Sequence, residues 1–446
     1  MTNKQKNIIC FGAGPAFKGG MSNYNTSLAK SLSTFENVKV HIVSWSEQYP
    51  SIIPRDFKDK VSSVDFLKDF DISVKYITNY NNPFSWTATA KYMASLNPDC
   101  VIIQWSIAIQ GLPIHYIVKK LKAICDCEVI FDLHFVIQKE KSNIDKTLTK
   151  FGISLADTYI VHAKKTFEEL QEIFPKKKFI LTESGERDLS KLTEEITVIK
   201  LFHPIYDLYQ PDPSFDVNAF KKENGLKENV FLFFGFIRKY KGLHNAIQAF
   251  NIVAKKRNDV SFLICGELFW KTLDSTSFLT KFKKSIFSII KMIFLHNTDD
   301  EKDYNPLTLI DALNLKDKTM VVSTFIPNED VNKYFQTADA GVLFYSTATP
   351  SGIESLSYNF DLPILTTNVG HFPETIQDGK NGYMTKDNTV EAMAETMLRF
   401  LDNPISNNSV ADFKDAFSWK KYSAAILNKK SSVNNESDTT TRGDDL

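Results

Sequence analysis

The sequence predicts an α/β protein built from two Rossmann-like, doubly wound halves that face a central cleft. The chain has 446 residues, of which 43% are hydrophobic, so it is long enough for two domains. Short β-rich runs alternate with helical patterns along the chain, an order typical of right-handed βαβ units. A segment with three prolines at 201–213 interrupts the alternation and separates the two halves.

The first half contains six expected strands, several of them apolar on both faces as buried parallel strands are. They lie at 7–12, 39–45, 72–78, 100–105, 128–134 and 157–163. Helices are expected between them at 22–34, 86–96, 113–124 and 164–173. The polar stretch 181–198 is interpreted as an excursion over the surface.

A second alternating series follows the break. Its expected strands lie at 230–235, 260–266, 319–324, 340–345 and 362–367, and its helices include 243–257, 328–337 and 388–402. Two such halves usually hold a ligand in the cleft between them, at the carboxyl ends of their strands. We therefore expect an N-terminal domain at 1–205 and a second domain at 206–408.

Charge and composition exclude several classes of function. The chain carries 53 Lys and Arg against 53 Asp and Glu, so it has no basic excess for binding nucleic acid. Five cysteines without a disulfide framework fit a reducing compartment. We expect no signal peptide, and no uncharged run reaches the ~18 residues of a membrane-spanning helix. These features together predict a cytoplasmic protein.

Two segments do not fit the alternation. Residues 276–297 contain four lysines and no acid, with apolar residues at helical spacing. This composition fits either an interfacial helix on anionic lipid, at the inner face of a membrane, or an ordinary amphipathic helix packed on its domain. Residues 429–446 contain almost no apolar side chains, which predicts a disordered tail.

Glycines follow the first expected strand. A dinucleotide-binding fingerprint would need a third glycine at Phe17 and an acid near Trp45, so NAD binding is not expected. A Walker A loop is also excluded, because no Gly-Lys-Ser/Thr follows. Gly19 and Gly20 remain, at the start of a helix, where the backbone can approach an anionic ligand closely. A tight strand-to-helix turn without a ligand is the alternative.

Two cations follow the first strand of the second half. The strand ends at Gly235, Arg238 and Lys241 lie in the connecting loop, and Gly242 opens a helix. Such cations point into the interdomain cleft and suit a diphosphate, because arginine can bind two oxygens and lysine supplies a point charge. A solvated basic loop is the alternative.

A third candidate is the helix that begins after a loop rich in Ser and Thr. Ser351 and Gly352 precede this helix, and Ile353 and Glu354 lie in its first turn. The free backbone N–H groups of such a turn can receive a phosphate. Glu354 alone could simply complement the helix dipole.

These stretches together resemble the nucleotide-sugar-binding domain of the retaining GT-B glycosyltransferases of the "glycosyl transferases group 1" type, a glycogen-synthase-like family. The resemblance is specific over 231–383 and looser before 205. In the second half it is carried by Gly235-Arg238-Lys241-Gly242, Phe325-Ile326-Pro327, Ala338-Asp339, Leu362-Pro363, Gly370-His371-Phe372-Pro373-Glu374, Asp378-Gly379 and Asn381-Gly382. In the first half it is carried by the order of Gly19-Gly20, His134, Ala156-Asp157 and His203-Pro204.

The resemblance implies a site as well as a fold. It implies that Arg238 and Lys241 act in catalysis on the donor diphosphate, and that His134 lies near the donor sugar. A histidine that merely caps a strand end is the alternative for His134. The implied donor-binding residues are Gly19, Gly20, Gly235, Arg238, Lys241, Ser351, Gly352, Ile353 and Glu354. Phe417-Ser418-Trp419 resembles the start of a final helix, so 409–428 is expected to return to the first domain.

One departure from the family concerns two glutamates that many relatives carry eight positions apart around the donor helix. Alignment on Leu362-Pro363 puts these positions at Ala348 and Leu356, and neither is acidic. The ribose contact of the second glutamate is therefore unassigned, with Glu354 as a substitute candidate.

The implied reaction moves a sugar from a nucleoside-diphosphate sugar to an acceptor hydroxyl with retention at the anomeric carbon. Arg238, Lys241 and the helix start at 352–354 would stabilise the leaving diphosphate, so we expect neither a metal nor a cofactor. The expected acceptor is a saccharide or lipid-linked saccharide of bacterial surface glycan synthesis. A non-catalytic sugar-nucleotide-binding protein is the alternative, and the donor base, donor sugar and linkage are left open.

Overall fold

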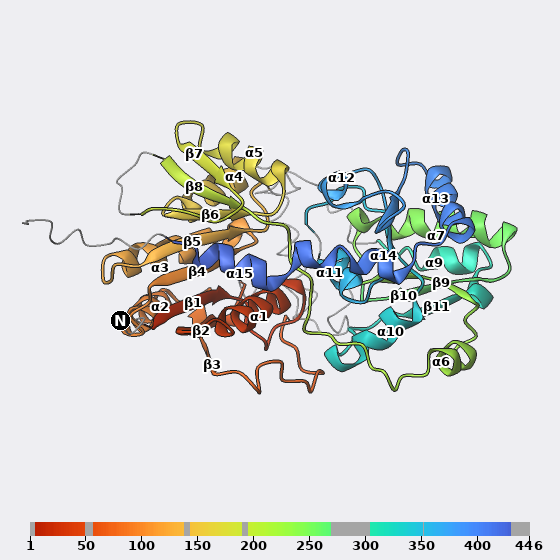
Figure 1. Cartoon of the computed structure of the whole chain (residues 1–446), viewed down its shortest axis with the longest axis horizontal. Helices are drawn as coiled ribbons and strands as arrows, with labels where there is room; N and C mark the ends of the chain where they lie inside the picture. Colours follow the sequence, from red (N-terminus) through yellow and green to blue (C-terminus); the bar gives the residue numbers. More distant parts are fainter. Residues whose placement is uncertain are drawn as a thin grey trace, which may run out of the picture.

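The computed structural model describes residues 5–49, 57–137, 143–189, 195–268, 304–350 and 352–429. Within these residues the chain forms two parallel sheets, one before and one after the segment at 201–213. Figure 1 shows the two sheets beside each other along the long axis of the molecule, each accompanied by its own helices. The α/β architecture predicted from the alternating pattern is confirmed.

The first sheet has eight parallel strands in the order β3-β2-β1-β4-β5-β6-β8-β7. Its central strands are buried along their whole length because helices cover both faces, which explains their continuous apolar sequence. The strands are β1 (Lys6–Gly12), β2 (Val38–Glu47), β3 (Ile72–Asn79), β4 (Cys100–Trp105), β5 (Glu128–Leu133), β6 (Thr158–Val161), β7 (Lys178–Thr182) and β8 (Glu195–Lys200). The helices are α1 (Gly20–Ser33), α2 (Pro83–Ser95), the 3₁₀ helix η1 (Ala108–Gln110), α3 (Gly111–Lys122), α4 (Asn143–Ile153) and α5 (Lys164–Ile173).

The second sheet has six parallel strands in the order β11-β10-β9-β12-β13-β14, the strand order of a Rossmann fold. The strands are β9 (Asn229–Phe234), β10 (Val260–Cys265), β11 (Thr319–Val322), β12 (Ala340–Leu343), β13 (Ile364–Thr366) and β14 (Gly382–Met384). The α-helices are α6 (Val217–Glu223), α7 (Leu243–Lys256), α9 (Thr308–Ala312), α10 (Val331–Thr337), α11 (Gly352–Asn359), α12 (Phe372–Thr375), α13 (Val390–Asp402), α14 (Asn407–Ala411) and α15 (Trp419–Leu427). The 3₁₀ helices are η2 (Lys239–Lys241), η3 (Lys316–Lys318), η4 (Asn328–Asp330) and η5 (Lys414–Phe417).

Three strands of the structure were not expected from the sequence: β7, β8 and β14. The stretch 181–198, interpreted as a surface excursion, contains the end of β7 and the start of β8, two strands that were not expected and that pair with each other. β7 is the edge strand of the sheet, and its Ile180 and Leu181 are 48% and 45% exposed. β8 lies between β6 and β7, but only two of its six residues are buried, so neither strand shows the apolar run of a central strand. β14 has three residues, too few for a period to emerge.

Some expectations fall on other parts of the chain. The basic helix at 276–297 and nearly all of the tail at 429–446 lie outside the described residues. In the part of the chain that is described, no helix has both the length and the hydropathy to cross a membrane. The domain bounds 1–205, 206–408 and 409–428 stay a prediction, which limited proteolysis can test.

The last helix, α15, packs against the first sheet although it follows the second sheet in sequence (Figure 1). Its Tyr422 hydroxyl lies 2.6 Å from that of Tyr24 on α1, and Ser423 donates a hydrogen bond to Ser31 at 2.8 Å. The indole of Trp419 lies 5.0 Å from the Tyr24 ring. The chain therefore crosses between the sheets twice, once at 201–213 and once just before α15.

A buried arginine fixes the far end of α15. Arg187 forms a two-pronged ion pair with Glu128 at 2.6 and 3.0 Å, and both side chains are 1% exposed. The same guanidinium donates a hydrogen bond to the carbonyl of Ile426 at 2.6 Å, and Thr158 donates one to Glu128 at 2.7 Å. The pair thus satisfies a carbonyl at the carboxyl end of α15 while anchoring it to the sheet.

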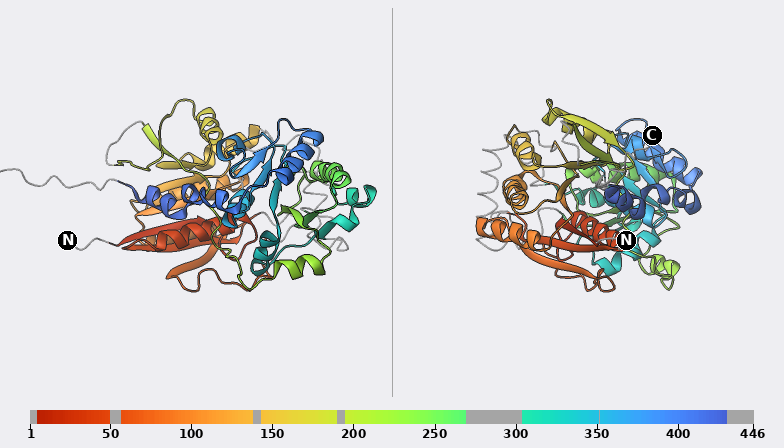
Figure 2. Two further views of the ribbon diagram at one scale, coloured as in Figure 1. Left: turned by 45° about the vertical axis from the view of Figure 1, so that its right-hand side comes forward. Right: turned by 60° about the vertical axis from the view of Figure 1, so that its left-hand side comes forward.

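Polar bridges also join the two halves across the cleft. Glu374 from α12 lies 3.1 Å from the ammonium of Lys200 and accepts a hydrogen bond from the backbone N–H of Lys164 at 3.1 Å. At the other side of the molecule, Glu329 accepts a hydrogen bond from the hydroxyl of Ser63 at 2.9 Å. Figure 2 shows the two halves in contact from two further directions.

Candidate active site

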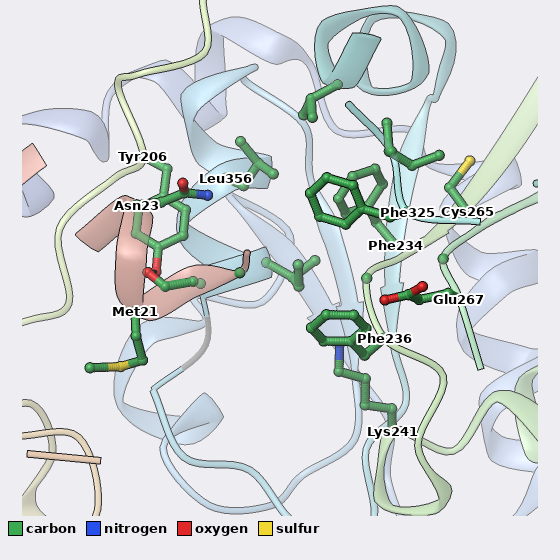
Figure 3. A pocket seen from close by; sticks show the side chains of 18 of the residues that line it. Met21, Asn23, Tyr206, Phe234, Phe236, Lys241, Cys265, Glu267, Phe325 and Leu356 are labelled. Atoms are coloured by element: carbon green, nitrogen blue, oxygen red, sulfur yellow. Dashed lines mark hydrogen bonds between the residues drawn. The ribbon is translucent and has the colours of Figure 1, made fainter. Parts of the chain in front are cut away.

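A cavity of about 330 Å³ lies between the two sheets, at the carboxyl ends of their strands (Figure 3). Segments that directly follow β5, β9, β10 and β12 line it, together with the start of α1 and the start of α11. Seven of the predicted site residues meet in this one cavity: Gly19, Gly20, His134, Gly235, Lys241, Gly352 and Ile353. The sequence pattern therefore placed most of its candidates at one location.

The loop after β9 carries the buried cation of the site. Gly242 adopts a φ of 67°, and a Cβ there would lie 2.0 Å from the carbonyl oxygen of Phe344, so only glycine fits this turn. The turn directs Lys241 inward, where it is 8% exposed and its ammonium lies 5.9 Å from the rings of Phe233 and Tyr345. The two rings lie near the ammonium itself, and Lys241 lines the cavity.

Lys241 lies close to the first turn of α11. A Cβ built on Gly235 would stand 3.0 Å from the Lys241 ammonium and 3.2 Å from the Cδ1 atom of Ile353. Gly235 itself has a φ of 91°, a conformation that L side chains rarely adopt. A bare stretch of backbone, a cation and a helix N-terminus thus converge on one small region of the cavity wall, a combination suited to an anion.

Arg238 is placed beside the cavity and does not line it. Its guanidinium lies over the Tyr240 ring at 5.3 Å from the ring centre, and the residue caps the 3₁₀ helix η2. The predicted diphosphate contact of Arg238 therefore requires its side chain to rotate toward Lys241. Ser351, another predicted site residue, lies outside the described residues.

Glu354 turns away from the large cavity. Glu354 follows Ile353 in α11, so its side chain is rotated by roughly 100° about the helix axis from that of Ile353. It lines a second, smaller cavity. There its carboxylate is hydrogen-bonded to His371 and accepts a hydrogen bond from the Tyr358 hydroxyl at 3.5 Å, and Glu354 is 4% exposed. This packing gives Glu354 a structural role, and it does not favour the ribose contact considered from sequence.

The opposite wall is the backbone at the start of α1. Gly19 has a φ of 94°, and its ideal Cβ position lies 3.6 Å from the ring of Phe236 across the cleft. The hydroxyl of Tyr206 donates a hydrogen bond to the carbonyl of Gly20 at 2.9 Å. A Cβ on Gly352 would lie 2.7 Å from the same hydroxyl. Tyr206, from the linker, is therefore wedged between the glycines of the two walls.

His134 follows β5 and contributes an imidazole to the cavity. Its Nε2 atom lies 2.8 Å from Oε1 of Gln104, and the ring of Tyr24 meets its edge at 4.6 Å. Burial lowers the pKa of His134 to about 4, with Asp132 opposing and His162 reinforcing the shift. The imidazole is therefore neutral near pH 7 and can take part in a hydrogen bond without adding charge.

A buried network supports His134 from behind. Asp132 accepts hydrogen bonds from Nε2 of His162 at 2.8 Å and from the Tyr422 hydroxyl at 3.0 Å. Burial alone would raise the pKa of Asp132, but His162 and the other hydrogen-bonding neighbours lower it to about 2. Tyr422 belongs to α15, so the returning helix contributes directly to the surroundings of His134.

Among the described residues, one group has the spacing of metal ligands: Asp132, His134 and His162, whose ligand atoms lie within 4.8 Å of one another. Both ring nitrogens of His162 already have oxygen partners, Asp132 and the carbonyl of Leu201 at 3.1 Å. The Nε2 atom of His134 also has a partner, Gln104. Hydrogen bonding alone accounts for the cluster. It was not predictable from sequence because its members come from the carboxyl ends of two different strands, β5 and β6.

Several cavity residues were missed from sequence. His203 and Tyr206 come from the linker, which was interpreted only as a boundary, and Glu267 follows β10 directly after Gly266. Figure 3 shows Phe236, Phe325 and Glu267 around the same cavity as Lys241. Position directly after a parallel strand was the available signal for Glu267. His203 also makes a polar contact to α11, since its Nδ1 atom lies 2.8 Å from the Ser355 hydroxyl.

This architecture, with two Rossmann-like sheets and a ligand-sized cavity at their facing strand ends, is that of the GT-B fold. Residues 214–416 match the model of the family "Glycosyl transferases group 1". The match lies in the second half of the chain and includes the stretch 231–383, whose motifs predicted this resemblance. No curated protein matches the sequence significantly.

Solved structures agree on the fold over nearly the whole chain. HepE from Anabaena, solved with UDP and glucose, is 12% identical, covers 95% of this chain and 97% of its own, and has a TM-score of 0.58. Sucrose-phosphate synthase from Thermosynechococcus elongatus is 13% identical, with 95% coverage of both chains and a TM-score of 0.56. WaaG, a glycosyltransferase of lipopolysaccharide biosynthesis, is 14% identical, covers 94% and 98%, and has a TM-score of 0.56.

Proposed function

We propose that this glycosyltransferase moves a sugar from a nucleoside-diphosphate sugar to an acceptor hydroxyl with retention of anomeric configuration. The observation that carries the proposal is the convergence of Lys241, the bare backbone at Gly235 and the first turn of α11 on one wall of the cleft cavity. A diphosphate is the group that matches this wall, because a cation and free backbone N–H groups bind its oxygens together.

In the proposed reaction, the bond between the anomeric carbon and a diphosphate oxygen breaks, and negative charge grows on the leaving diphosphate. The acceptor oxygen forms a new bond to the anomeric carbon on the same face, and its proton passes to the leaving diphosphate. The Lys241 ammonium and the N–H groups at the start of α11 stabilise that charge from fixed positions. Arg238, after rotation from Tyr240, adds a second cation. No step of this scheme calls for a metal or a cofactor, so we propose that the donor substrate alone completes the site.

The first half supplies the other wall. The neutral imidazole of His134 donates its Nε2–H to Gln104, so its Nδ1 atom can accept a hydrogen bond from a hydroxyl of the donor sugar. Gln104 and Tyr24 fix the position of the ring. The backbone of Gly19 and Gly20 approaches the donor from the side of the acceptor. Together the walls exclude water when the cleft is occupied, which limits hydrolysis of the donor.

We further propose a saccharide or lipid-linked saccharide acceptor, in bacterial surface glycan synthesis at the cytoplasmic side of the membrane. The composition of 276–297 supports this proposal. The likeness in fold to WaaG, a glycosyltransferase of lipopolysaccharide biosynthesis, is consistent with it.

A panel of nucleotide sugars tests the reaction. The protein is incubated with each donor and with candidate saccharide acceptors, release of nucleoside diphosphate is followed, and the anomeric configuration of the product is determined by NMR. We expect one donor to turn over with retention, at a rate unchanged by EDTA. Inversion would refute the stereochemical proposal, and loss of turnover in EDTA would refute metal independence.

The alternative is a sugar-nucleotide-binding protein without transferase activity. It is favoured by one observation: Leu356, at the position of the second family glutamate, lines the cavity and offers no carboxylate to a donor, and Ala348 is 3% exposed. Isothermal titration with UDP, GDP, ADP and dTDP separates the cases. Binding without turnover would support the alternative, and no binding of any nucleotide would refute both.

A further inference from the structure

An exposed apolar patch lies on the helices beside the first sheet. Phe84 on α2 is 88% exposed, and Leu112 and Tyr116 on α3 are 53% and 39% exposed. Isolated apolar side chains are common on protein surfaces, but neighbouring large ones are a mark of a contact surface.

The three side chains lie on neighbouring helices. α2 and α3 pack side by side, with the ring of Trp86 5.8 Å from that of Tyr116 and the Thr87 hydroxyl 2.8 Å from the Tyr116 hydroxyl. Leu112 and Tyr116 are four residues apart and so share one face of α3. Phe84 and Leu112 both belong to the first turn of their helices.

The charge on these helices has one sign. Neither α2, with 13 residues, nor α3, with 12 residues, contains an Asp or a Glu, although the whole chain has as many acids as bases. The exposed faces carry Lys91, Lys119 and Lys120. A fourth lysine, Lys122, is paired with Asp157. Apolar tips at the start of each helix and lysines one to two turns further along match the boundary of an anionic bilayer.

The patch also lies toward the cleft. α2 follows β3 and α3 follows β4, so both helices begin on the side of the sheet at which the strands have their carboxyl ends. His134 lies on the same side, directly after β5, which is the neighbour of β4 in the sheet. The amino-terminal turns that carry Phe84 and Leu112 therefore lie on the same side of the sheet as the candidate active site.

We propose that the outer face of α2 and α3 docks on an anionic phospholipid surface, with Phe84, Leu112 and Tyr116 entering the interface and Lys91, Lys119 and Lys120 contacting headgroups. The purpose of the docking rests on the proposed function: it would bring the cleft close to a lipid-linked acceptor. A lipid surface fits better than an acidic protein, since the exposed groups are flexible lysine stems and apolar tips without a groove to hold a chain.

Vesicle flotation with the full chain tests the docking. We expect binding to vesicles of phosphatidylcholine and phosphatidylglycerol at 3:1, and at least about tenfold weaker binding to pure phosphatidylcholine. Replacing both Phe84 and Leu112 by Ser should weaken binding by about tenfold or more. Replacing Lys91, Lys119 and Lys120 by Gln should weaken it by roughly 100-fold at low salt, since each lysine near an anionic surface contributes about fivefold.

Matched controls distinguish this surface from the rest of the chain. The control for the apolar change is Ile180→Ser with Leu181→Ser, two exposed residues of the edge strand β7. The control for the charge change is Gln at Lys255, Lys256 and Lys420, which are exposed on other helices. Equal loss in variant and control, full binding by both variants, equal binding to neutral vesicles, or no vesicle binding at all would each overturn the proposal.

A separate readout keeps this proposal independent of the proposed function. The affinity for UDP in the absence of vesicles should be the same in the wild type and in all four variants, because none of the changed residues lines the cleft cavity. Wild-type protein that binds vesicles but no nucleotide would refute the proposed function and leave the docking surface standing. Protein that binds nucleotide but not vesicles would do the opposite.

Discussion

Replacing Lys241 by Gln should weaken nucleoside-diphosphate binding more than any other single change on this wall. The side chain is 8% exposed and its ammonium lies between the rings of Phe233 and Tyr345. Hydrogen bonds to a charged group contribute about 1.5–3 kcal/mol. With 1.4 kcal/mol for each factor of ten, the dissociation constant should rise by about 10- to 150-fold.

Isothermal titration with UDP, or with whichever nucleotide binds best, measures this effect. Lys239 is the matched control, because it belongs to the same 3₁₀ helix and is exposed. Lys239→Gln should change the affinity by less than about threefold, as expected for a solvated charge. An unchanged affinity in Lys241→Gln, or an equal loss in both variants, would refute the placement of the diphosphate, provided that thermal melting shows both proteins folded.

Three further predictions concern stability and the cleft. Arg187→Ala should lower the free energy of unfolding by about 3–5 kcal/mol in urea titrations, because it leaves the buried carboxylate of Glu128 unpaired; a loss below 1 kcal/mol would contradict this. Gly352→Ala should weaken UDP binding and cost about 1–3 kcal/mol of stability, because its methyl group would lie 2.7 Å from the Tyr206 hydroxyl, whereas unchanged melting and affinity would refute the wedge. Acidification from pH 6.5 to about 4 should lower the free energy of unfolding by about 3 kcal/mol, because His134 takes up a proton in the unfolded chain but stays neutral in the native protein. Protonation of Asp132 should lower it further toward pH 2. His134→Gln should remove the His134 part of the loss, and an equally steep pH dependence in that variant would contradict the assignment.

The fold was predictable because its core strands are long apolar runs with clear boundaries. The strand that ends at Gly235 and the glycine that opens α7 are fixed by local chemistry, since a φ of 67° at Gly242 excludes other residues. β7 was not predictable in this way. As an edge strand with exposed Ile180 and Leu181 it carries no burial pattern of its own, and its pairing with β8 depends on tertiary structure.

The site was predictable to the level of segments but not of side-chain direction. The pattern placed Lys241, Gly352 and His134 at strand and helix ends, and the structure brings them to one cavity. It could not show that Glu354 faces His371 on the far side of α11, or that Arg238 stacks on Tyr240. The direction of Glu354 depends on how α11 is rotated about its axis, and the position of Arg238 depends on its rotamer. Neither can be predicted from a single sequence.

The most direct test of the account is a crystal structure of the full chain with a bound nucleoside diphosphate. The account predicts the nucleotide in the cavity between the sheets, with phosphate oxygens about 3 Å from the Lys241 ammonium and from the N–H groups at the start of α11. It also predicts His134 on the side of the vacant sugar position. A nucleotide bound elsewhere, or one whose phosphates face away from Lys241, would contradict it.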